Sequence, residues 1–173
     1  MDALAQAQHL LATGQFTAAL VLYKQCVPAT PHAALRLHLA LGLCLHGSHE
    51  DEAAFQEFEA GRAIAVMLAD VGEVISLDVL AARTLIALAR YELLADRLTT
   101  DLTKRVPFVA EERLPFLTRE LYFWLWEGAR AAGNHPAARL YHSIATALFE
   151  RDLAPDIRAL LDQIIAHIQQ FGV

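Results

Sequence analysis

The chain has little of the cysteine that zinc sites and redox exchange require. Its 173 residues include two cysteines, Cys26 and Cys44, and no CxxC pair. A structural zinc site needs four ligands, and redox motifs space their thiols closely, so these two positions support neither. We expect both residues to be reduced, buried thiols, and we expect the chain to hold no metal and no cofactor.

A targeting signal and a membrane-spanning run are also lacking. The chain begins with Met1 and Asp2, an acid where a secretory signal has a basic region. The longest apolar stretch, residues 33–45, contains Arg36 and His38 and falls short of the roughly 20 apolar residues that cross a bilayer. The sequence therefore predicts a cytoplasmic protein that does not bind a membrane.

Basic residues are fewer than acidic residues. The chain has 14 Lys and Arg residues against 20 Asp and Glu, which gives a formal net charge of -6. This charge repels a phosphate backbone unless the basic residues gather on one face. Hydrophobic residues make up 55% and charged residues 20%, a balance typical of a globular chain rather than a disordered one. We expect a single folded domain, 1–173, and no nucleic-acid partner.

Catalytic signatures are missing as well. The sequence contains no GxSxG elbow, no phosphate-binding glycine loop, no HExxH and no Rossmann fingerprint. The densest group of possible ligands, residues 46–51 (HGSHED), is typical of a helix start, with Ser48 as the N-cap and Asp51 in an acidic first turn. A metal site in this loop is the alternative. We expect no enzyme activity.

Apolar residues recur at three- and four-residue spacing almost everywhere in the chain. Apolar and polar residues do not alternate over any sustained stretch, as they would in a β-strand. Four of the eight Gly residues, Gly14, Gly47, Gly72 and Gly133, and the six Pro residues fall at intervals that interrupt this pattern and mark helix ends. The sequence therefore predicts an all-α fold of about nine helices, antiparallel to their neighbours. Their approximate limits are 2–13, 16–27, 32–46, 50–69, 73–89, 91–105, 109–132, 136–151 and 155–171.

The helices pair into a repeat. Three units share a turn glycine, then a small residue, then a larger ring four positions later. The matching sets are Gly14, Ala19 and Tyr23; Gly47, Ala54 and Phe58; and Gly133, Ala138 and His142. In the degenerate third unit, Leu94 and Leu98 replace the small residue and the ring. The predicted units are 2–31, 32–70, 73–106 and 109–151, and the amphipathic helix 155–171 closes the stack.

A physical reason accompanies each repeated position. A turn glycine adopts the left-handed conformation that ends the first helix of a pair at little cost. A small residue lets the second helix cross closely over its partner, and the ring one turn later fills the space between units.

These positions resemble the tetratricopeptide repeat (TPR) family over roughly residues 3 to 150. The resemblance implies a right-handed superhelical stack of helix pairs, a TPR-like α-solenoid, whose first helices line a concave groove that binds peptides. The Lys and Asn residues with which some members clamp a C-terminal carboxylate are replaced here by Leu4, Gln8, Leu39 and Leu43. The groove positions that the resemblance implies are Arg36, Leu39, Leu43 and His46; Val79, Arg83, Ile86 and Arg90; and Phe123, Glu127 and Arg130.

The function that the resemblance implies is a protein–protein interaction module: an adaptor, scaffold or chaperone that holds a peptide or helix of another protein. One alternative is a structural homo-oligomer that uses the groove or the C-terminal helix. Another is a small-ligand sensor with a closed pocket near Arg83 and Trp124.

Two local features of the groove positions have alternative interpretations. Arg83 and Arg130 either face a partner, are solvated, or pair with Asp78 and Glu127 on their own helices. Residues 121–126 (LYFWLW) concentrate aromatic rings in less than two helical turns. Their helix is therefore either buried on all sides or exposes an aromatic anchor for a partner, and Trp124 and Trp126 fit both readings.

Overall fold

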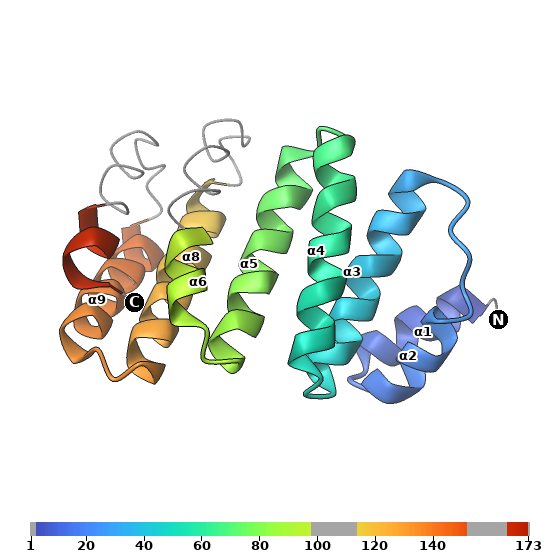
Figure 1. The fold of residues 1–173 in the computed structure, drawn as a ribbon, viewed down its shortest axis with the longest axis horizontal. Helices are drawn as coiled ribbons and strands as arrows, with labels where there is room; N and C mark the ends of the chain where they lie inside the picture. Colours follow the sequence, from blue (N-terminus) through green and yellow to red (C-terminus); the bar gives the residue numbers. More distant parts are fainter. Residues whose placement is uncertain (1–2, 98–113, 152–165, 173) are drawn as a thin grey trace. The chain divides into compact units, whose positions relative to one another are not determined.

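A computed structural model of the chain describes residues 3–97, 114–151 and 166–172, which form α-helices joined by turns and one longer connection (Figure 1). These described residues contain no strand, so the all-α prediction is confirmed. The chain divides into two compact units, Met1–Thr84 and Leu85–Val173. No helix in the described part of the chain is both long enough and apolar enough to cross a membrane.

The first unit contains α1 (Ala3–Ala12), α2 (Phe16–Tyr23), α3 (Pro31–Gly47), α4 (Asp51–Met67) and most of α5 (Val71–Ala87). Consecutive helices pack against one another from α1 to α4. The hydroxyl of Thr30 caps α3 by accepting a hydrogen bond from the Ala33 amide at 3.1 Å, and Pro31 occupies the first helical position.

The predicted helix 16–27 is too long. In the structure α2 ends at Tyr23, and residues 24–30 form an irregular connection to α3. Pro28 has no amide hydrogen to continue the helix and disfavours the helical conformation in the residue before it. This connection is longer than the other described turns.

The second unit contains α6 (Tyr91–Arg97), α8 (Leu114–Ala131), α9 (His135–Arg151) and a short helical segment, residues 166–171. The helices α8 and α9 pack against each other. Much of the predicted helices 91–105 and 155–171, including Leu98, lies outside the described residues.

The described helices are joined by a recurring three-residue turn. Its middle residue is left-handed in each of five cases: Gly14 (φ 74°), His49 (φ 63°), Ala69 (φ 56°), Ala89 (φ 56°) and Gly133 (φ 75°). In the turn between α3 and α4, the Glu50 amide donates to the Leu45 carbonyl at 2.9 Å and the His49 amide to the His46 carbonyl at 3.0 Å. The same pair of bonds closes the other four turns.

The predicted turn at Gly47 is wrong. Gly47 is the last residue of α3, and His49 takes the left-handed position. The N-cap prediction for Ser48 is also wrong, because Ser48 is the C-cap residue of α3 and Glu50 is the N-cap residue of α4. The acidic first turn, Asp51 and Glu52, is confirmed.

The repeated small residues and rings form the core of the first unit. Ala19 and Ala54 are fully buried, as are almost all of Tyr23 and Phe58. A Cβ atom at Gly42 of α3 would overlap the ring of Phe58, so α3 and α4 approach closely there. The prediction that these positions are buried is therefore confirmed, and the Phe58 ring lies against α3, the first helix of its own predicted pair.

In the last repeat the predicted ring position is displaced by one residue. His142 is exposed, whereas Tyr141 is fully buried together with Ala137. Ala138 is still buried. The inward stripe of α9 therefore passes through Ala137 and Tyr141, and His142 lies beside it on the outer side of the helix.

Polar contacts also join the helices of the first unit. His38 Nδ1 lies 2.7 Å from Glu57 Oε2, between α3 and α4. The Nε of Arg62 donates to Oδ1 of Asp78 at 2.7 Å, between α4 and α5, and Asp78 is 2% exposed. A buried carboxylate needs such a partner, because an unpaired charge inside the protein is costly.

Candidate functional site

The first unit contains a hollow of about 730 Å³ between α1, the α2–α3 connection and the first half of α3. Its lining includes Leu4 and Gln8 of α1, Val27 and Pro28 of the connection, and Arg36 and Ala40 of α3. This volume falls within the range of roughly 300–1,000 Å³ that is usual for ligand-binding clefts. We refer to it below as the α1–α3 hollow.

The hollow exists because α2 stops early. Residues 24–30 leave the helix axis after Tyr23, and Figure 1 shows them as a long loop between α2 and α3. Residues 26–30 of this loop form one wall of the hollow. On the opposite side α3 contributes the small side chains of Ala33 and Ala40, which leave the space open. Val27, in the wall itself, is 91% exposed.

The charge of the hollow differs in sign from that of the chain. No Asp or Glu is among its lining residues, while Arg36 and His32 are. Arg36 is exposed, and it makes no ion pair with any residue that the structure describes. In a chain of formal charge -6, this hollow is suited to a ligand that carries a carboxylate.

Tyr23 and Cys26 also line the hollow. Tyr23 is buried, and burial raises the pKa of its hydroxyl, with smaller contributions from Cys44 and Cys26. Cys44 is fully buried, as predicted, and burial raises the pKa of its thiol. The buried-thiol prediction is wrong for Cys26, which is half-buried and lines the hollow.

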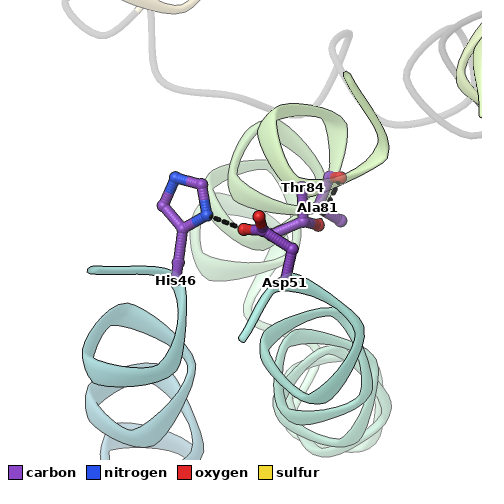
Figure 2. A network of polar contacts seen from close by, with 4 residues as sticks. All are labelled: His46, Asp51, Ala81 and Thr84. Carbon is purple, nitrogen blue, oxygen red and sulfur yellow. Dashed lines mark hydrogen bonds and ion pairs between the residues drawn. The ribbon is translucent and has the colours of Figure 1, made fainter. Parts of the chain in front are cut away.

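Of the predicted groove residues on α3, only Arg36 lines the hollow. Leu39 and Leu43 are half-buried and lie on α3 beyond the hollow's lining. The Nδ1 atom of His46 is hydrogen-bonded to Oδ1 of Asp51 at the start of α4 (Figure 2). This bond ties the end of α3 to α4, so at least one imidazole nitrogen of His46 is already engaged.

The predicted residues on and after α5 are divided between the two units. Val79 and Ile86 are half-buried, whereas Arg83 and Arg90 are exposed, and each arginine interacts with another residue of the chain. Asp78, the alternative partner considered for Arg83, is engaged by Arg62 of α4. Near Arg83, the hydroxyl of Thr84 donates to the Ala81 carbonyl at 2.8 Å (Figure 2).

The predicted residues on α8 include an ion pair. Arg130 Nη2 lies 2.9 Å from Glu127 Oε2, which confirms the alternative that Arg130 pairs on its own helix. Phe123 is 37% exposed, and Trp124 and Trp126 are half-buried. The helix is therefore not buried on all sides, and Phe123 presents an aromatic ring to solvent.

Sequence reasoning missed most of the hollow. Val27, Pro28 and His32 belong to it but were expected at the end of a helix or outside the groove. Pro28 and Pro31, which bracket the connection, are the available signal, since they mark where α2 cannot continue. No three His, Cys, Asp or Glu side chains gather as a possible metal site within the described part of the chain.

No family model, curated protein or solved structure matches the chain. The resemblance to tetratricopeptide repeats therefore rests on the sequence positions alone.

Proposed function

We propose that the chain is a non-enzymatic protein-interaction module that holds a segment of another protein in the α1–α3 hollow. The observation that carries the proposal is the hollow itself, which is open, largely apolar and free of lining carboxylates. We further propose that the helix pairs stack as a TPR-like superhelix. The recurring turns at Gly14, His49, Ala89 and Gly133, one in each proposed pair, support this arrangement.

The chemistry of the lining defines the kind of segment. Leu4, Val27 and Pro28 offer apolar surface that is exposed to solvent, and covering such surface favours binding. Arg36 offers a guanidinium that can donate paired hydrogen bonds to a carboxylate. The matching partner segment places apolar side chains next to Asp or Glu.

Alkylation of Cys26 by iodoacetamide tests this function, because Cys26 lines the hollow while Cys44 is fully buried. The probe is a short synthetic peptide that alternates leucine with glutamate, and the matched peptide has lysine in place of glutamate. We expect the glutamate peptide to slow the alkylation of Cys26 in a saturable manner and the lysine peptide to leave it unchanged.

Two charge reversals separate binding in the hollow from a general charge effect. Arg36→Glu is expected to raise the peptide concentration needed for protection by about tenfold or more, since a hydrogen bond to a charged group contributes roughly 1.5–3 kcal/mol. Lys24→Glu makes the same change at an exposed residue outside the hollow and is expected to have little effect. Equal protection by both peptides, or full protection of the Arg36→Glu variant, would contradict the proposal.

A further inference from the structure

The α8–α9 hairpin carries a row of aromatic rings on its surface. Phe123 meets Trp124 edge-on with ring centroids 4.9 Å apart, and it meets Trp126 in the same way at 5.5 Å. Trp126 in turn meets His142 of α9 at 4.9 Å. Phe123 and His142 are exposed, and Trp126 is half-buried. This row therefore offers ring surface to a partner.

The core of the hairpin is built from other residues. Tyr122, Leu125 and Tyr141 are fully buried on the inner faces of α8 and α9. The row is thus not needed to fill the space between the two helices. Exposed aromatic rings held in fixed contact are typical anchors of protein interfaces, because they bury a large area at little cost in side-chain entropy.

A shallow hollow of about 450 Å³ lies beside the end of this row. Its lining consists of Trp126, His135, Ala138, Arg139 and His142. Of these residues, Ala138 is buried, while His135 and Arg139 are exposed. We call this set the Trp126 hollow.

The Trp126 hollow is basic. None of its lining residues is acidic, and Arg139 makes no ion pair among the described residues. A guanidinium next to an indole and two imidazoles accommodates an anion that adjoins a flat apolar group. A carboxylate beside an aromatic side chain has this chemistry, and so does a nucleotide, but the formal charge of -6 disfavours a polyphosphate.

We propose that Trp126, Arg139 and His142 form a second docking site, which binds a protein segment that carries an aromatic side chain next to Asp or Glu. The aromatic side chain packs against Trp126 and Phe123, and the carboxylate accepts hydrogen bonds from Arg139. This site lies within the second unit and does not depend on the α1–α3 hollow.

Intrinsic tryptophan emission tests the second site. The chain has two tryptophans, Trp124 and Trp126, and both belong to the ring row. Trp124→Phe leaves Trp126 as the reporter. The probes are a peptide that alternates phenylalanine with aspartate, a matched peptide with lysine in place of aspartate, and adenosine monophosphate. We expect a saturable change in emission with the aspartate peptide only.

Reversing the charge of Arg139 tests whether the aspartate peptide binds at the Trp126 hollow. In the Trp124→Phe background, Arg139→Glu is expected to raise the apparent Kd of the aspartate peptide about tenfold or more. Lys24→Glu, in the first unit, is expected to leave that Kd unchanged. A response to adenosine monophosphate as strong as to the peptide, a Kd that Arg139→Glu does not change, or no emission change with the aspartate peptide would each overturn the assignment.

Discussion

Three left-handed turn residues carry side chains where glycine would fit with less strain. His49, Ala69 and Ala89 have φ values of 63°, 56° and 56°. In this conformation a Cβ atom crowds the following carbonyl oxygen, which costs roughly 1–2 kcal/mol for a residue other than glycine. Two backbone hydrogen bonds close each of these turns despite that cost.

Ala69→Gly is therefore expected to stabilise the chain. The gain should be about 0.5–1 kcal/mol, because the relief of strain exceeds the extra backbone entropy that glycine loses on folding. Ala63→Gly, at an exposed position inside α4, is the matched control and should destabilise by about 1 kcal/mol. Urea unfolding followed by circular dichroism measures both changes. A loss of stability in Ala69→Gly equal to that of the control would contradict the expectation.

Only some of these turns could be predicted from the type of residue at the left-handed position. Gly14 and Gly133 were predicted as turns because only glycine adopts this conformation at little cost. His49, Ala69 and Ala89 give no such signal, because neighbouring contacts rather than the residue itself impose the conformation. Gly47 misled the prediction: a glycine near a helix end is also used where another element comes close, here the ring of Phe16.

At the scale of elements, the C-terminal segment 166–172 is fixed to the α8–α9 hairpin. The Tyr141 hydroxyl donates to the Gly172 carbonyl at 2.7 Å, and the side-chain amide of Asn134 donates to the Phe171 carbonyl. The imidazole of His167 lies among the rings of Tyr122, Tyr141 and Phe171, and its Nδ1 is 3.5 Å from the Tyr122 hydroxyl.

Docking of this segment is expected to weaken in acid. Burial lowers the pKa of His167 below its ordinary value of 6.5, so the docked state favours the neutral ring. Its contribution to docking is therefore complete above pH 6.5 and declines as the pH falls from there through the lowered pKa. Amide signals of residues 166–172 in NMR spectra, followed through the titration, measure this change.

Two measurements check that His167 is responsible. The tyrosines remain neutral over this range, since burial raises the pKa of Tyr141 to about 12 and that of Tyr122 further. In the variant His167→Phe the change in docking between neutral and weakly acidic pH should largely disappear. A pKa of His167 above 6.5, read from its own ring signals, would reverse the predicted direction.

The sequence predicted which segments are helical better than it predicted where each helix ends, and the α1–α3 hollow depends on where α2 ends. The spacing of apolar residues located the helices, yet it could not show that α2 ends at Tyr23, because Val27 fits an apolar stripe as well as a loop. The hollow depends on that end point. In the last repeat, Tyr141 and His142 are neighbouring rings, and only the direction of packing decides which one is buried.

At the scale of the molecule, each unit has a core of its own. Leu20, Tyr23 and Phe58 are buried in the first unit, and Tyr122, Leu125 and Tyr141 in the second. A compact unit with its own buried side chains is expected to fold by itself. The all-α fold was predictable from periodicity alone, whereas the division at residues 84 and 85 falls inside α5 and has no marker in the sequence.

We expect a fragment of residues 1–90, which ends after the turn that follows α5, to fold as a helical unit. Its folded state should protect Cys44 from alkylation, because the cysteine stays fully buried between packed helices. A fragment of residues 1–50 lacks α4, and so loses Phe58, and should leave Cys44 reactive. Mass spectrometry of the alkylated fragments measures the protection. Rapid alkylation of Cys44 in both fragments would show that the first unit needs the second.

The recurrence of one turn geometry makes these connectors interchangeable. The triplets at residues 13–15, 48–50, 68–70, 88–90 and 132–134 share the same closing hydrogen bonds and a left-handed middle residue. The glycine-containing triplet Thr13-Gly14-Gln15 is therefore expected to fit at the other junctions. Diversity among the units then resides in helix length and surface chemistry. One pair of helices could therefore be redesigned while the turn that joins them is kept.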